Sequence, residues 1–182
     1  DIDAIRSDSL SAVEKAEEVA PVVQGPRRAF TMGDREAGHG SLREAEILYR
    51  LAKTKAEAIE ENWQLAAESI ATAEKAVAAK SGSASDSIRG ILTAAKEAMD
   101  AEEPAEALHI ASSIPAHIES LEASSGEAEV AIADAEAALK SAEGELALAN
   151  AERLTEAKEA LAKGDVPLAK GLADSLAREV RE

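Results

Sequence analysis

The chain of 182 residues carries 36 acidic and 20 basic side chains, for a formal net charge of −16, and it has no cysteine. This acidity excludes ordinary nucleic-acid binding, which needs Lys and Arg to neutralise phosphates, and it disfavours contact with anionic membranes. The lack of cysteine excludes disulfides and thiol catalysis. No apolar run approaches the roughly 18 residues of a membrane span, so we expect no membrane insertion and a soluble protein, cytoplasmic or in a compartment that the sequence does not name.

The composition predicts an all-α fold. Apolar residues make up 46% of the chain, but only 2% of the residues are aromatic. Alanine is the most frequent residue, and alanine, Glu, Leu and Lys are all strong helix formers.

Residues 1 to 20 predict a short helix. One side of that helix is apolar, with Ile2, Ile5, Val13, Ala16 and Val19 expected to face inward. For residues 21 to 40 we expect a connecting loop, because Gly33, Gly38 and Gly40 disfavour a helix there. A connection of this length is typical of a functional or a mobile segment.

The clearest helix is expected over residues 41 to 80. Ser41 followed by Glu44 is a capping box, which satisfies free amides at a helix start. Apolar residues then recur three and four positions apart, which is the pattern of a coiled coil. Alanine at such a seam lets a neighbouring helix approach closely. The seam consists of Tyr49, Ala52, Ala56, Ile59, Trp63, Ala66, Ile70, Ala73 and Val77.

After a break at residues 81 to 87, a second long helix is expected over residues 85 to 123, broken near Pro104. The residue before a proline avoids helical geometry, so the chain either kinks or turns back there. The segment LTAAKEA at residues 92 to 98 is echoed by LTEAKEA at residues 154 to 160, which favours the turn. His117 falls on an apolar stripe of this helix, and we expect it to be partly buried.

A third long helix is expected over residues 127 to 163, since SSGE at residues 124 to 127 predicts a break before it. This helix would contain Gly144, at a cost near 1 kcal/mol. The segment KGDVP then predicts a stop at Gly164 and a restart at Asp165, with a last helix over residues 165 to 182.

These elements predict an antiparallel long-helix bundle with coiled-coil-like, alanine-rich packing, either spectrin-like or an array of helical hairpins. The chain starts without a methionine and ends in a helical pattern without a cap. We therefore expect a piece of a longer protein, whose last helix continues past Glu182.

Five side chains are candidate partner contacts. The loop expected at residues 21 to 40 holds the only Phe of the chain, an Arg pair and a His between glycines, and the only Trp lies on the seam. Trp and Arg are favoured at the centres of protein interfaces. For the Trp we favour core filling over a partner contact. For the loop we favour a simple joint, with Phe30 or Met32 packed against the bundle, over a contact surface. The candidates are Arg27, Arg28, Phe30, His39 and Trp63.

Two Glu-x-x-His spacings occur, Glu36 with His39 and Glu106 with His109. Ferritin-like bundles hold two metal ions with two such motifs on facing helices. The first spacing lies in the expected loop, however, and a chain this rich in glutamate gives such spacings by chance. We therefore predict no catalytic residue, no metal site and no cofactor.

The leading functional hypothesis is a non-catalytic structural or interaction module, a helical spacer or scaffold segment of a larger protein. The alternative is a protein-binding or homodimerisation module that engages a basic partner, which an uncovered apolar stripe would favour. A di-metal helical-bundle enzyme is the third hypothesis.

Overall fold

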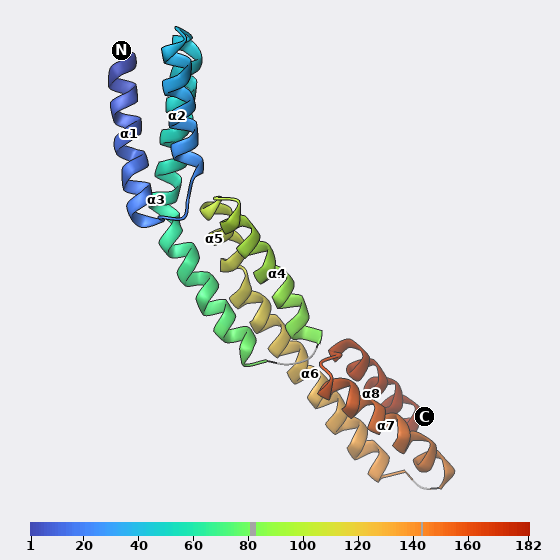
Figure 1. The fold of residues 1–182 in the computed structure, drawn as a ribbon. Coiled ribbons are helices and arrows are strands. Elements are labelled where there is room, and N and C mark those ends of the chain that lie inside the picture. The colour runs from blue at the N-terminus through green and yellow to red at the C-terminus, as the bar shows by residue number, and fades with distance from the viewer. Residues whose placement is uncertain (81–82, 143) are drawn as a thin grey trace. The chain divides into compact units, whose positions relative to one another are not determined.

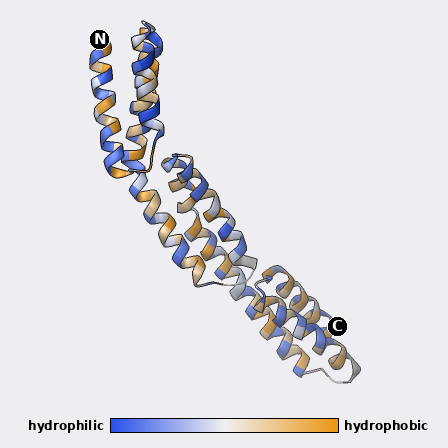
Figure 2. Ribbon diagram, in the orientation of Figure 1, coloured by the Kyte–Doolittle hydropathy of each residue, from blue (hydrophilic) through white to orange (hydrophobic). Residues whose placement is uncertain are grey.

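The fold is all-α, as predicted: the computed structural model describes residues 1–80, 83–142 and 144–182, and these contain helices and short turns but no strand (Figure 1). Apolar and polar positions alternate around the helices, which gives most of them one side suited to burial (Figure 2). The helices are α1 (Ile2–Val19), α2 (Gly25–Gly38), α3 (Leu42–Ala78), α4 (Ser83–Asp100), α5 (Pro104–Ser112), α6 (Ile114–Lys140), α7 (Glu145–Ala162) and α8 (Val166–Arg181).

The chain forms two compact units. The first contains residues 1–72 and 92–112, and the second contains residues 73–91 and 113–182. Helices α3 and α4 each contribute residues to both units. Part of the predicted break at residues 81 to 87 lies outside the described residues.

The core of the first unit is built by α1, α2 and the first half of α3. It mixes a few large side chains with many alanines, which brings the helices close together. Ile2, Ile5, Leu10, Ala37 and Trp63 pack around its edge. Its buried members are Ala12, Val13, Ala16, Ala20, Val23, Ala29, Phe30, Ala45, Tyr49, Ala52, Ala56 and Ile59.

The prediction of a connecting loop over residues 21 to 40 is wrong, because residues 25–38 form α2. Pro26 lies in the first turn, where a proline fits a helix. Gly33 is buried against α3, and a Cβ added there would lie 2.7 Å from two carbon atoms of the Tyr49 ring. This glycine permits close packing. The turn that ends the helix comes later, at Gly40, whose φ is +82°.

The predicted seam of α3 faces the interior. Eight of its nine residues are buried, and Trp63 is half-buried. The stripe is thus covered by helices of the same chain.

At Pro104 the chain turns back, and Figure 1 shows α5 beside the end of α4. The Glu103 amide donates to the Ala98 carbonyl and the Glu102 amide to the Met99 carbonyl, both at 2.9 Å. These two bonds define a Schellman turn, which usually has glycine where this chain has Glu102. The φ of Glu102 is accordingly 61°.

In the second unit α6, α7 and α8 pack on one another. The turn between α7 and α8 follows the prediction, with φ of +79° at Gly164 and the Asp165 carboxylate accepting a hydrogen bond from the Leu168 amide at 3.3 Å. The buried residues of this core are Ala128, Ala131, Ile132, Ala135, Leu154, Ala157, Ala160, Val166, Ala169, Ala173, Leu176 and Ala177.

Two predicted boundaries in this unit are wrong. Helix α6 runs through residues 124–127 without a break, because Gly126 has open space around it and the buried residues that follow, beginning with Ala128, hold the helix in place. The predicted helix over residues 127–163 instead ends at Lys140, and Gly144 lies between helices with φ of +81°. His117, expected on an apolar stripe, is exposed.

Candidate functional site

The first unit contains all five candidate contact residues, and the structure separates them into interior and surface positions. Phe30 is 4% exposed and belongs to the core, and Trp63 is half-buried at its edge. Arg27 is half-buried, whereas Arg28 and His39 are exposed. The five side chains therefore do not form one surface.

A polar network ties α1, α2 and α3 together beside this core. Arg6 donates to both carboxylate oxygens of Asp34, with Nε at 2.7 Å from Oδ1 and Nη2 at 3.0 Å from Oδ2. The Tyr49 hydroxyl donates to Oδ1 of the same carboxylate at 2.7 Å. Two-pronged pairs of this kind fix geometry as well as charge.

This network changes the pKa values of its members. The hydrogen bonds from Arg6, helped by the bond from Tyr49, hold the pKa of the Asp34 carboxyl below its usual value, although partial burial opposes this. Burial raises the pKa of the Tyr49 hydroxyl, and the bond to Asp34 raises it further. All three groups therefore keep their ordinary charge states near neutral pH.

Two arginines lie near the ring of Phe30. The guanidinium carbons of Arg6 and Arg27 are 5.1 and 5.9 Å from the centre of its ring. Arg27 also donates to both carboxylate oxygens of Glu17, at 2.8 and 2.7 Å, and this holds the pKa of the Glu17 carboxyl below its usual value. Arg27 is thus engaged within the unit, where it covers an aromatic ring and pairs with an acid.

Glu102 connects the α4–α5 turn to the start of α2. Its two carboxylate oxygens accept hydrogen bonds from the backbone amides of Gln24 and Gly25, each at 2.7 Å. The first amides of a helix lack partners within the helix. Helix α2 therefore takes its N-terminal cap from a residue about 80 positions later in the sequence.

Neither Glu-x-x-His spacing forms a ligand cluster. His39, Glu106 and His109 are exposed, and Glu36 is half-buried. Among the side chains of residues 1–80, 83–142 and 144–182 that the structure describes, no three His, Cys, Asp or Glu groups lie close enough together to hold a metal ion.

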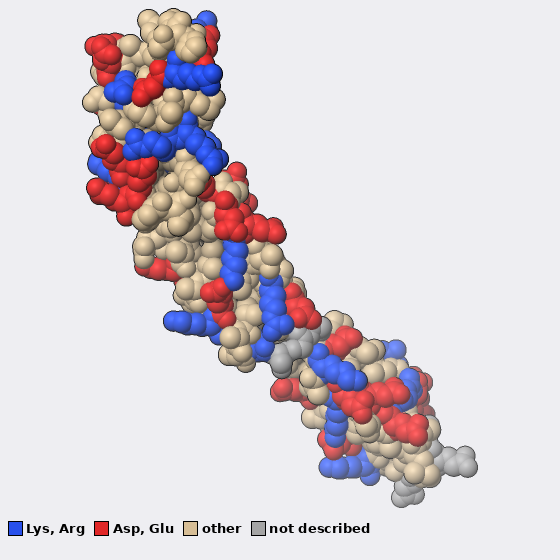
Figure 3. Space-filling view, viewed as in Figure 1, with Lys and Arg blue, Asp and Glu red and all other residues tan. Residues whose placement is uncertain are grey.

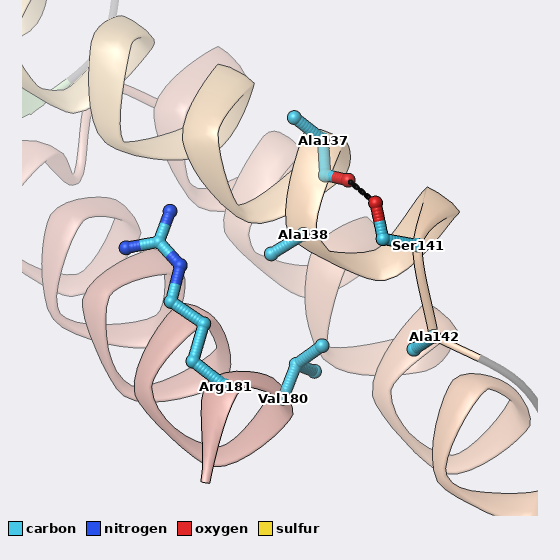
Figure 4. Close-up of a pocket in the computed structure, with 6 residues that line it drawn as sticks. All are labelled: Ala137, Ala138, Ser141, Ala142, Val180 and Arg181. Carbon is cyan, nitrogen blue, oxygen red and sulfur yellow. Dashed lines mark hydrogen bonds between the residues drawn. The ribbon is translucent and has the colours of Figure 1, made fainter.

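A hollow of about 360 Å³ lies between the end of α6 and the end of α8 (Figure 4). Its lining is mostly alanine and valine, and the Ser141 hydroxyl bonds to the Ala137 carbonyl at 3.3 Å. Ligand sites usually combine apolar walls with a few converging polar groups. Among the lining residues that the structure describes, Arg181 is the one charged side chain.

A second hollow, of about 210 Å³, lies beside Ser85 in the second unit. An ion pair between Lys80 and Glu122 borders it. The Ser85 hydroxyl is buried and has no hydrogen-bond partner among the described residues. The volume of this second hollow is below the roughly 300 Å³ at which ligand pockets usually begin.

Sequence reasoning missed Asp34, Tyr49 and Glu102 as polar anchors. A signal was present for the first two. Once residues 25–38 are treated as a helix, Asp34 falls one turn after Phe30, and Tyr49, its partner, belongs to the predicted seam of α3. No local signal marks Glu102, because its partners lie in a distant segment.

Comparison with known proteins finds no matching family model, no matching curated protein and no matching solved structure. Of the helices in the part of the chain that the structure describes, none is long and apolar enough to cross a membrane.

Proposed function

We propose that this chain is a non-catalytic helical module that acts as a spacer or scaffold. Its alanine-rich helices would form an antiparallel array that sets a distance and presents a charged surface to protein partners. The observation that carries this proposal is the burial of the α3 seam, where eight of nine residues are buried. A seam already filled by helices of its own chain is not available to a second copy.

The polar groups near the first core also support a structural role. Asp34 and Glu17 are each held by an arginine, and Tyr49 donates to Asp34. A general acid or base works best with a pKa near the operating pH, whereas the pKa values of these two carboxyls are lowered away from neutrality.

A receptor for a basic protein is the second candidate function. Residues 113–182 contain 15 acidic and seven basic side chains. Surface charge of one sign speeds the encounter with an oppositely charged partner. This candidate shares the non-catalytic character of the first and differs in requiring a specific partner.

Light scattering after size exclusion, combined with small-angle X-ray scattering at low and high salt, tests the spacer proposal. We expect the monomer mass of 18.9 kDa and a maximum dimension no shorter than α3 itself, roughly 55 Å at 1.5 Å per residue. Both values should be the same at both salt concentrations. A mass twice as large would show that the module dimerises and would contradict the proposal.

Two leucine substitutions on α3 sharpen this test. Ala56→Leu enlarges a buried seam residue, and Ala71→Leu enlarges an exposed residue of the same helix. Overpacking of a filled seam destabilises by about 1–3 kcal/mol, so Ala56→Leu should lower the unfolding midpoint and Ala71→Leu should not. Equal midpoints would mean that the seam is not filled in solution.

A further inference from the structure

The outward side of α2 carries two arginines and a methionine on one face. Arg28, Met32 and Arg35 follow one another at four and three residues, so their side chains lie on the same side of the helix. Both arginines are exposed, and Met32 is 55% exposed. We call these three residues the α2 basic face. The opposite side of the helix packs into the core through Pro26, Ala29, Phe30 and Gly33.

The two arginines of this face have no acidic partner among the described residues. Arg28 donates to the amide oxygen of Gln24, a bond that holds its guanidinium without neutralising it. By contrast, the nearby arginines Arg6 and Arg27 each pair with a carboxylate. Unpaired guanidinium groups are available to bind a carboxylate through two parallel hydrogen bonds.

The surrounding sequence has a charge opposite to that of the whole chain. Residues 24–56 contain seven Lys and Arg and four Asp and Glu, a balance of +3 in a chain of net charge −16. Figure 3 shows Lys and Arg side chains gathered over α2. Exposed large apolar side chains also occur in this segment: four of the ten among the described residues lie between residues 24 and 56.

We propose that the α2 basic face binds an acidic, amphipathic helix of another protein. The inference rests on the proposed scaffold function and names the chemistry of one partner. Charge complementarity selects the partner: Arg28 and Arg35 bind carboxylates, while Met32 gives an adaptable apolar contact between them. The spacing of the three residues suits a partner helix lying along α2.

A fluorescently labelled synthetic helix of about 20 residues, with leucine at every third or fourth position and glutamate elsewhere, serves as the probe. Its affinity for the full chain is measured by anisotropy at low and moderate salt. We expect binding that weakens with salt. Arg28→Glu with Arg35→Glu should weaken binding at least about tenfold, because attraction becomes repulsion at two contacts.

A matched control carries the same change of net charge elsewhere. Lys140 and Arg178 are exposed residues of the second unit without an ion pair in the described structure, and Lys140→Glu with Arg178→Glu should leave the affinity within about twofold. Met32→Asn should weaken binding several-fold with little change in its dependence on salt. Circular dichroism checks that each variant is folded.

Four outcomes would overturn this proposal. The first is equal loss of affinity in the control pair, which would show a general effect of net charge. The second is binding of an oligonucleotide of equal charge as tightly as the helix. The third is a concentration-dependent doubling of mass that Arg28→Glu with Arg35→Glu abolishes, which would make a second copy the partner. A chain that keeps its scattering dimensions but fails to bind the probe would sink this inference and leave the spacer proposal standing.

Discussion

The carboxylate of Glu102 accepts a hydrogen bond from the backbone amide of Gly25 across 77 residues of sequence. A Cβ added to Gly25 would overlap the Oε2 atom of Glu102 that accepts this hydrogen bond, so the glycine gives the acid room to reach the backbone. The turn that follows α4 and the helix that begins at Gly25 are thereby held together within the first unit.

Removing this cap should destabilise the protein. Glu102→Ala should lower the free energy of unfolding by about 1–2 kcal/mol, the usual range for loss of an N-terminal cap. Chemical denaturation measures this. The neighbouring residue supplies the control: Glu103 is exposed, and Glu103→Ala should change the free energy of unfolding by less than about 0.5 kcal/mol. Equal effects at the two positions would contradict the role of Glu102.

Glycine at the same position should cost less than alanine. The φ of Glu102 is 61°, a conformation that costs a residue with a Cβ about 1–2 kcal/mol and costs glycine little. Glu102→Gly therefore loses the cap but relieves part of the backbone strain. A variant less stable than Glu102→Ala would show that the strain is not present in solution.

Close packing of α2 on α3 depends on the missing side chain at Gly33. Gly33→Ala should destabilise by about 1–3 kcal/mol through overpacking against the Tyr49 ring. Gly38 has no atom within 4 Å of an added Cβ and has no positive φ, so Gly38→Ala should be neutral or should stabilise by up to about 1 kcal/mol. Thermal unfolding of the two variants tests this, and a stabilised Gly33→Ala would argue against α2 packing here.

Stability should fall on acidification because of Asp34 and Glu17. The pKa of each carboxyl is lower in the folded protein than its ordinary value, so the folded state binds fewer protons near pH 4. Their contribution is fully present above the unfolded pKa, near 4, and is lost as the pH falls through the folded values. Urea midpoints between pH 6 and pH 2 should decline less in Asp34→Asn than in the unmodified protein. An unchanged decline would mean that the Arg6 pair contributes nothing in solution.

Two buried serines should respond oppositely to alanine. Ser9 donates to the Tyr49 carbonyl at 2.8 Å, whereas the Ser85 hydroxyl has no partner among the described residues. Ser9→Ala should cost about 1 kcal/mol, and Ser85→Ala should be neutral or stabilising, because burying an unpaired hydroxyl is unfavourable. Equal losses at both positions would show that Ser85 is hydrogen-bonded in solution.

Helix content and the α7–α8 turn could be predicted because they depend on neighbours in the sequence. Alanine and glutamate favour helix wherever they occur, and Gly164 followed by Asp165 ends one helix and starts the next. The seam of α3 was equally readable, because its apolar period is local.

The errors arose where a distant contact decides the local structure. A glycine is needed at position 33 of α2 because the Tyr49 ring, 16 residues later, occupies the space that a side chain would need. The sequence around Gly33 does not contain that information. The predicted break at residues 124–127 is wrong because the packing of the residues that follow, beginning with Ala128, keeps α6 continuous there. Phe30 is a candidate contact from the sequence because its segment does not read as an amphipathic helix, whereas the alternative of Phe30 packed against the bundle agrees with its burial.

The central claim, that α3 is a stiff element of fixed length, is tested most directly by one distance. Since the chain has no cysteine, Arg43→Cys with Ala71→Cys places two spin labels on exposed positions of the part of α3 that lies in the first unit, and pulsed electron paramagnetic resonance measures their separation. The 28 intervening steps predict a narrow distribution near 42 Å, at about 1.5 Å per residue. A broad distribution, or a mean well below that value, would show that α3 bends or breaks and would contradict the spacer proposal.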